Sequence, residues 1–238
     1  MSNLDILLDC VDRYNKEGWN KDDDIPDPVL ENRYPLIHWA AALGKVHALE
    51  WMLASGFNPT SKSTGVGETA LHRSILCLYR ARAKFTVKEL KPKFTKIASL
   101  LKDCLLLKDE ANGDTPLHTA AGMLVNAEHK PNFFVSCIEI IVFQAKKQAE
   151  YTDAILNGIN NDGETALHIL ARGEKQKVDP CCLAVKSLIT AGADRSTRNN
   201  EGQTALDIAL LNGAQLLVEE LIRVCFISRN KGHFHFLK

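Results

Sequence analysis

Histidines with nearby threonines and acids recur along the chain, and these residue types could carry chemistry. The sequence reads Gly-Glu-Thr-Ala-Leu-His up to His72, and Gly-Asp-Thr-Pro-Leu-His up to His118. Residues 160–171 read Asn-Asn-Asp-Gly-Glu-Thr-Ala-Leu-His-Ile-Leu-Ala and gather acids, a hydroxyl and His168 within a few positions. A histidine aided by a carboxylate can act as a general base or bind a metal. Such chemistry requires the fold to bring these side chains together.

The same stretch is a turn followed by the start of a helix, and it recurs in five registers. Asn-Asn-Asp-Gly favours a tight turn, Thr165 is placed to cap a helix, and the apolar residues after it follow helical spacing. Counted from Pro35 through Thr69, Thr115, Thr165 and Thr204, the copies are 34, 46, 50 and 39 residues apart. Such a repeat, lengthened by inserts, predicts a stacked array in which the histidines are strung one to a repeat and do not converge.

The Thr-Pro-Leu-His wording at 115–118 resembles that of the ankyrin-repeat family. The resemblance covers about residues 32–224 and implies an all-α solenoid of stacked helix-turn-helix units with short hairpin loops. It also implies that the motif threonine and histidine are structural and join neighbouring loops by hydrogen bonds. The chain departs from the family wording at Ala70, Ala166 and Ala205, which replace proline, and at Asp207, which replaces histidine.

Three regions are expected from the order of these signals. Residues 1–31 form an N-terminal capping helix and an acidic connector, residues 32–224 form about five repeats, and residues 225–238 form a C-terminal tail. The tail carries Phe234 and Phe236 among basic residues. The sequence leaves open whether this tail caps the array or is partly disordered.

Composition excludes several classes of protein. The 238 residues have a formal net charge of zero and a pI near 7.1, so no global charge points to nucleic acid or to a membrane surface. The seven cysteines are unevenly spaced and form neither a disulfide framework nor a zinc motif. No long apolar run predicts a membrane span or signal peptide. We therefore expect an intracellular protein with no membrane partner, in the cytoplasm or the nucleus.

Known catalytic motifs are missing from the sequence. It has no Gly-x-Ser-x-Gly, no phosphate-binding loop and no His-Glu-x-x-His. The neighbouring Cys181 and Cys182 could form a redox pair, or could lie at a helix start with one side chain in the core. We expect no enzyme activity, no cofactor and no metal.

The family resemblance implies that a partner is bound on the concave side, by the turn tips and the first helices. By register with the family, the exposed positions there are Asn112, Asp114, Met123, Asn161, Asp162, Glu164, Arg172, Asn200, Glu201 and Gln203. Their slight acidic excess favours a basic or neutral peptide. The stretched layout also resembles the ankyrin cores of nuclear transcription regulators, which favours the nucleus and implies a protein-interaction module or scaffold in a transcription or chromatin complex.

A basic insert at residues 79–102 separates the two helices of the second repeat, with the return helix expected at about 95–106. Its candidate phosphate-binding residues are Arg80, Arg82, Lys84, Lys88, Lys91 and Lys93. With aromatic residues interleaved, such a stretch could contact DNA or RNA. It could equally be a solvated helix face, or bind an acidic partner or the acidic N-terminal segment of this chain. The sequence does not decide among these.

Overall fold

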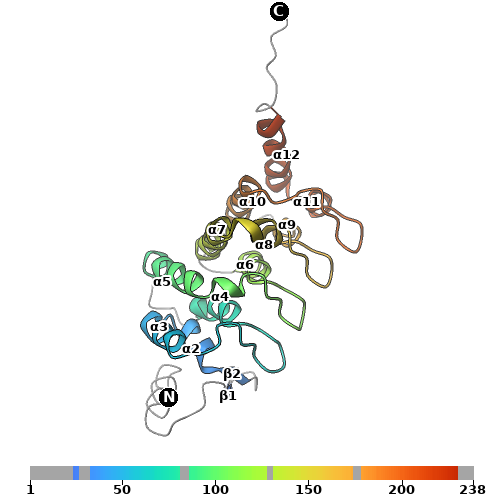
Figure 1. The fold of residues 1–238 in the computed structure, drawn as a ribbon. Helices are drawn as coiled ribbons and strands as arrows, with labels where there is room; N and C mark the ends of the chain where they lie inside the picture. Colours follow the sequence, from blue (N-terminus) through green and yellow to red (C-terminus); the bar gives the residue numbers. More distant parts are fainter. Residues whose placement is uncertain (1–23, 27–32, 81–85, 128–130, 174–177, 230–238) are drawn as a thin grey trace, which may run out of the picture.

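Helices in successive antiparallel pairs make up most of the computed structural model, which describes residues 24–26, 33–80, 86–127, 131–173 and 178–229. The first helices of the five pairs described are α2 (Leu36–Ala42), α4 (Ala70–Arg80), α6 (Pro116–Val125), α9 (Ala166–Ala171) and α11 (Ala205–Leu211). The second helices are α3 (Val46–Ala54), α5 (Val87–Leu100), α7 (Pro131–Lys147), α10 (Val178–Ala191) and α12 (Gln215–Arg229). The pairs stack in sequence order as an all-α solenoid, and hairpin loops project from one edge (Figure 1).

Each first helix begins where the repeated motif predicts it. Thr115 has an extended backbone, with φ −82° and ψ 166°, and forms a capping box with His118, while Pro116 occupies the first helical turn. Thr165 and His168 repeat this capping box at the start of α9. The motif therefore sets both the start of the helix and the direction of the hairpin before it.

The hairpin loops of neighbouring repeats are joined through their backbones. In each joint a backbone N–H of the later loop donates to a carbonyl of the earlier loop. These bonds join Glu110 to Val66 at 2.9 Å, Asn161 to Asn112 at 2.9 Å, and Asn200 to Asp162 at 3.0 Å. The hairpins consequently form a continuous edge along repeats two to five.

The second helices form an outer layer that packs side by side. Phe94 of α5 meets Phe133 of α7 edge-on, with ring centroids 6.2 Å apart, and Phe133 meets Phe134 at 5.3 Å. All three rings are buried. In the inner layer, fully buried alanines such as Ala121 and Ala171 let the first helices approach closely.

The return helix of the second repeat starts earlier than predicted. It was expected at about 95–106, but α5 begins at Val87, after a capping box between Thr86 and Glu89, and contains Pro92. A short 3₁₀ helix, η1 (Lys102–Cys104), follows. The second half of the basic insert is thus a helix, because the Thr-x-x-Glu box supplies a start signal within the insert.

Three further elements were not predicted. A two-stranded antiparallel sheet is formed by β1 (Asp24–Pro26) and β2 (Arg33–Pro35) ahead of α2. The 3₁₀ helix η2 (Ala149–Tyr151) and helix α8 (Thr152–Leu156) fill the connection between repeats three and four.

The expected capping helix near the N-terminus lies outside the described residues. At the other end, α12 continues past the predicted boundary at Val224 to Arg229, and residues 230–238 are again outside the description. Within the ranges described, no helix has the length and apolar character needed to cross a membrane.

Candidate functional site

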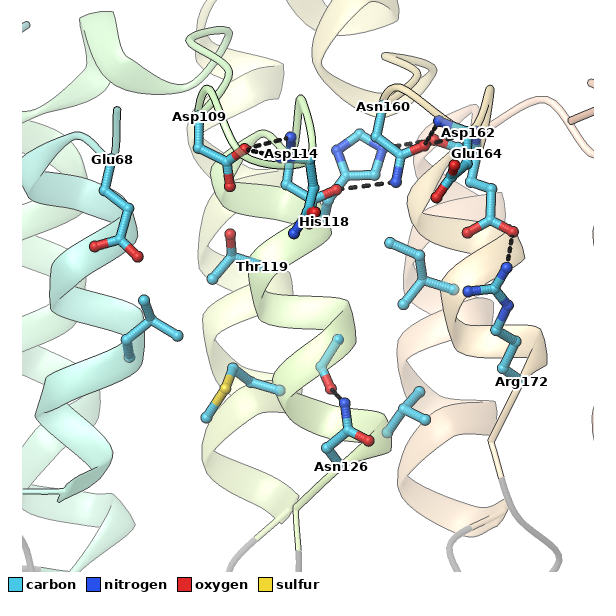
Figure 2. A pocket seen from close by; sticks show the side chains of 16 residues that line it. Glu68, Asp109, Asp114, His118, Thr119, Asn126, Asn160, Asp162, Glu164 and Arg172 are labelled. Carbon is cyan, nitrogen blue, oxygen red and sulfur yellow. Dashed lines mark hydrogen bonds and ion pairs between the residues drawn. The ribbon is translucent and has the colours of Figure 1, made fainter. Parts of the chain in front are cut away.

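An open groove of about 880 Å³ runs across the first helices of repeats two, three and four, below their hairpin loops. Figure 2 shows the acidic side chains gathered at the hairpin end of the groove, with Asn126 at the opposite end of α6. The groove is lined by Glu68, Leu76, Asp109, Asn112, Asp114, His118, Thr119, Gly122, Met123, Val125, Asn126, Asn160, Asp162, Glu164, Ile169 and Arg172. Its position matches the concave side that the family resemblance implies.

The rim of the groove carries carboxylates from successive hairpins. Asp109 is held in place because its Oδ1 accepts from the backbone N–H groups of Asn112 and Asp114, at 2.8 and 3.2 Å. Asp162 is exposed at the tip of the next hairpin. These fixed carboxylates give the rim a negative potential that favours a cationic side chain of a partner.

Apolar side chains form the floor of the groove. Leu76, Met123, Val125 and Ile169 come from α4, α6 and α9, and Thr119 adds a hydroxyl between them. Met123 and Ile169 are only partly buried, so part of their apolar surface faces the groove. An occupant can therefore bury apolar groups on the floor while its charged groups meet the rim.

Glu164 differs from its sequence prediction. It was expected at an exposed position, but the residue is only 1% exposed. Its carboxylate forms a close ion pair with Arg172, whose side chain is 53% exposed. The prediction of an exposed Glu164 is wrong because the arginine, two helical turns later, folds back over it. Glu68 likewise lies 3.9 Å from Arg73, so the net negative charge of the groove rests on its aspartates.

The motif histidines lie within the joints between repeats. In His118, Nδ1 accepts from the backbone N–H of Thr115 at 3.2 Å and lies 2.7 Å from its hydroxyl, and Nε2 donates to the carbonyl of Glu164 at 2.8 Å. The same bridge runs from His72 to the Asp114 carbonyl at 2.9 Å and from His168 to the Gln203 carbonyl at 3.1 Å. The structural role implied by the family resemblance is confirmed for these residues.

This bonding requires neutral imidazoles. Burial lowers the pKa of His72 to about 4, partly offset by its bond to the Asp114 carbonyl, and burial likewise lowers the pKa of His118. His38 occupies the corresponding place in repeat one, and burial lowers its pKa to about 4. Its Nε2 lies 2.9 Å from the Ser61 carbonyl. In the part of the chain that the structure describes, no three His, Cys, Asp or Glu residues are grouped to hold a metal.

The remaining predicted positions lie along the hairpin edge, outside the groove lining. Asn161, Asn200 and Glu201 are exposed, and Gln203 is half-buried with its carbonyl bonded to His168. Asn200 donates through Nδ2 to the Asn161 carbonyl at 2.9 Å, so these two asparagines fasten neighbouring tips. Contact with a partner at the ten predicted positions stays a prediction.

Lysines of the basic insert take part in contacts with neighbouring repeats. Lys91 lies 3.3 Å from Glu139 of α7, and Lys96 lies 3.0 Å from Glu50 of α3. Lys88 and Lys93 lie on the same helix, while Arg82 and Lys84 are outside the described residues and Arg80 ends α4. The described part of the insert is accordingly a helix face with bonds to its neighbours, which favours the solvated-face interpretation.

Two of the described cysteines have thiols with raised pKa values. Burial raises the pKa of Cys104 to about 12, and burial with nearby carboxylates raises that of Cys182 to about 11. Cys181 is buried at the start of α10. A raised pKa lowers the thiolate fraction, so Cys104 and Cys182 are poorly suited to redox chemistry at neutral pH.

Sequence reasoning missed Glu68, Asp109 and Asn160 as groove residues. Asp109 and Asn160 each hold a hairpin by accepting backbone N–H bonds through Oδ1. Both precede the motif threonine by a similar distance, and that register was a usable signal. Glu68 directly precedes Thr69, and only stacking of the repeats brings it to the groove.

Comparisons with known proteins agree with this architecture. A family model described as "Ankyrin repeats (many copies)" matches residues 37–85. The Schizosaccharomyces pombe "Cell division cycle-related protein res1/sct1" is 25% identical over 186 residues, covering 77% of this chain and 26% of the relative. "Start control protein cdc10" of the same organism is 25% identical over 195 residues, covering 79% and 23%. The chain thus spans about a quarter of the length of these relatives.

A solved structure shares the fold. A chain in the "Bd0816 Predatory Endopeptidase from Bdellovibrio bacteriovorus in complex with immunity protein Bd3460" matches with a TM-score of 0.54 and 23% identity, over 89% of each chain. The repeated motif, its histidine bridges, the family model over residues 37–85 and the two relatives together support the likeness of this chain to the ankyrin-repeat family.

Proposed function

We propose that this chain is a non-catalytic interaction module that binds a segment of a partner protein in the groove. The observation that carries this proposal is the combination of an acidic rim and an apolar floor in one open groove. Asp109, Asp114 and Asp162 supply the rim, and Met123 and Ile169 contribute to the floor. A partner segment that fits carries lysine or arginine at one end and apolar side chains beyond it.

The groove is built before any partner arrives. Asp109 and Asp114 are held by hydrogen bonds within and between hairpins, and α4, α6 and α9 are packed against one another. A rigid surface loses little conformational entropy on binding, which supports recognition of a mobile segment. Affinity would come from the buried apolar contacts, and orientation from the rim charges.

The relatives suggest a setting for this interaction. Their names connect them with the cell division cycle and with Start control. We extend this to the present chain as a regulatory role, in a transcription or chromatin complex of the nucleus. A basic protein tail is one partner segment of the required chemistry.

Changing the rim without disturbing the turns tests the proposal. Replacing Asp109, Asp114 and Asp162 by asparagine removes three charges while keeping an Oδ1 acceptor at each position. Short synthetic peptides that pair Lys or Arg with Leu are titrated against the wild-type chain, and the tightest binder is carried forward. The triple variant is expected to bind this peptide at least about tenfold more weakly.

A matched control separates the groove from general charge. Asp194 and Glu219 are exposed acids that do not line the groove and are not among the predicted contact positions, and their amide variants are expected to keep full affinity. If the rim variant binds the peptide as tightly as wild type, or if no peptide of this composition binds, the proposed function is wrong.

A further inference from the structure

The last repeat leaves uncovered the surface on which every earlier repeat stacks. In α6 and α9 the stacking position is an alanine, Ala121 or Ala171, and both are fully buried. The corresponding residue of α11 is Leu210, which is 56% exposed. The same position of α4 is Ile75, which is fully buried while α4 packs against α2 and α6, so a large apolar side chain at this position is covered in an earlier repeat.

The fifth repeat also lacks the groups that bind a following repeat. Asp207 replaces the motif histidine, and its carboxylate accepts from the backbone N–H and the hydroxyl of Thr204 at 2.9 and 2.8 Å. It therefore keeps the helix cap but has no second nitrogen to reach an adjoining carbonyl. Around Gly202 there is open space, whereas Gly163 lies against Asn200 of the following hairpin. This end is not built to receive a sixth ankyrin repeat.

What it offers is an apolar surface. Leu206 lies one helical turn before Leu210 and is partly exposed, and Ile222 of α12 is 42% exposed. A hollow of about 450 Å³ lies beside them, between Leu221 and Ile222 on one side and the loop 193–196 on the other. We call Leu206, Leu210, Ile222 and this hollow the end face. Unless another segment covers the end face, its leucines remain in contact with water, which is unfavourable for large apolar side chains.

We propose that the segment 230–238 of this chain binds the end face through its apolar side chains. They read Asn-Lys-Gly-His-Phe-His-Phe-Leu-Lys, with three large apolar side chains at Phe234, Phe236 and Leu237. They follow directly on α12, whose last residue is Arg229, and their own arrangement lies outside the described residues. The segment and the end face are thus covalent neighbours with matching apolar character.

The lengths of the two elements agree. Seven residues separate Ile222 from the end of α12 at Arg229, a rise of about 10 Å along a helix. Nine extended residues reach about 30 Å, so the segment is long enough to reach Ile222 and Leu210. Tethering sets an effective concentration of about the millimolar range, which favours this segment over a second molecule.

A double-mutant cycle in the full chain tests this contact. The segment variant carries Phe234→Ser, Phe236→Ser and Leu237→Ser, and the face variant carries Leu210→Ser. Each is expected to lower Tm by about 3–6 °C, and their combination should fall short of the sum because both remove the same contact. Hydrogen exchange of the α11 amides should rise at least about threefold in the segment variant.

Leu183→Ser is the matched control, since Leu183 is 55% exposed on α10 and lies off the end face. Its effect should add fully to that of the segment variant. A segment variant that melts and exchanges like wild type, or additivity with Leu210→Ser, overturns the proposal. A wild-type Tm that rises with protein concentration also overturns it, by assigning the end face to a second copy of the chain. None of these readouts involves the groove.

Discussion

Asn160 donates a hydrogen bond through Nδ2 to the carboxylate of Asp114 at 3.0 Å, across the joint between repeats three and four. The Oδ1 of the same amide accepts from the backbone N–H groups of Asp162 and Glu164, each at 3.0 Å. One largely buried side chain therefore shapes a hairpin and orients an acid of the groove rim. Folding of the repeat and formation of the rim depend on the same residue.

Asn160→Ala is expected to destabilise the chain by about 2–3 kcal/mol, since it removes three hydrogen bonds. Asn199 provides the comparison, because its Oδ1 accepts from the backbone N–H groups of Glu201 and Gln203, and both bonds lie within its own hairpin. Asn199→Ala should cost about 1 kcal/mol less. Urea denaturation of both variants measures the difference, and equal losses would show that the bond to Asp114 contributes nothing.

Alanine substitutions at three hairpin glycines distinguish the cost of backbone strain from the cost of a clash between neighbouring repeats. Gly113, Gly163 and Gly202 have φ of 69°, 71° and 75°, so alanine is strained equally at each. A Cβ on Gly113 or Gly163 would lie under 3.0 Å from Asn161 or Asn200, while one on Gly202 meets nothing within 4 Å. Alanine at the first two positions should therefore cost about 1–2 kcal/mol more than at Gly202. Similar midpoints in thermal melts of all three variants would contradict this.

Acidification should weaken the array through its buried histidines. Burial lowers the pKa of His38 and His72 from 6.5 to about 4. Between these values the unfolded chain binds more protons than the folded chain, so stability falls as pH falls through this window. From pH 7 to pH 5 the loss is on the order of 2 kcal/mol for each histidine.

Chemical denaturation at the two pH values measures that loss, and His72→Asn supplies the control. The variant is less stable at pH 7 because it loses the bond to the Asp114 carbonyl, but its pH dependence should be smaller than that of wild type. A wild-type chain with equal stability at pH 5 and pH 7 would show that these histidines become protonated without unfolding.

Charge reversal on α5 addresses the nucleic-acid interpretation of the basic insert. Lys88→Glu, Lys91→Glu and Lys93→Glu together are expected to leave peptide binding in the groove unchanged and to move Tm by no more than about 4 °C, since exposed ion pairs contribute little. Electrophoretic mobility shifts with short DNA and RNA duplexes provide the second measurement. Salt-sensitive binding by wild type that the variant loses would instead support direct contact with phosphates.

The joints of this fold could be predicted from the sequence because they are built from a short repeated motif. Thr115 and His118 lie three residues apart, and their spacing alone specifies the capping box. The partner of His118, the carbonyl of Glu164, lies 46 residues away, and the family resemblance supplied that contact. Because the same motif recurs in successive repeats, one contact between repeats predicts the equivalent contact at the next joint.

Features that occur once were harder to predict. The pairing of Glu164 with Arg172 reverses the expected exposure of the acid. The equivalent acid of repeat two, Glu68, lies near Arg73, an arginine at a different spacing, so the motif did not reveal the pair. The start of α5 was missed although Thr86 and Glu89 carry a capping-box signal. Asn112, Asp114, Met123, Asp162 and Arg172 line the groove, and their contact with a partner stays a prediction, whereas Glu68 reaches the groove only through stacking.

The long second helices place the extra length of repeats two to four away from the hairpins. In repeats two and four, residues are added between the first and second helix, whereas repeat three also carries η2 and α8 after its second helix. The hairpins keep their continuous backbone bonds throughout. The two edges of the solenoid are consequently uncoupled. Residues can be added or removed at the inter-helix edge without shifting the register of the groove, so the molecule can acquire new features there and keep its recognition surface intact.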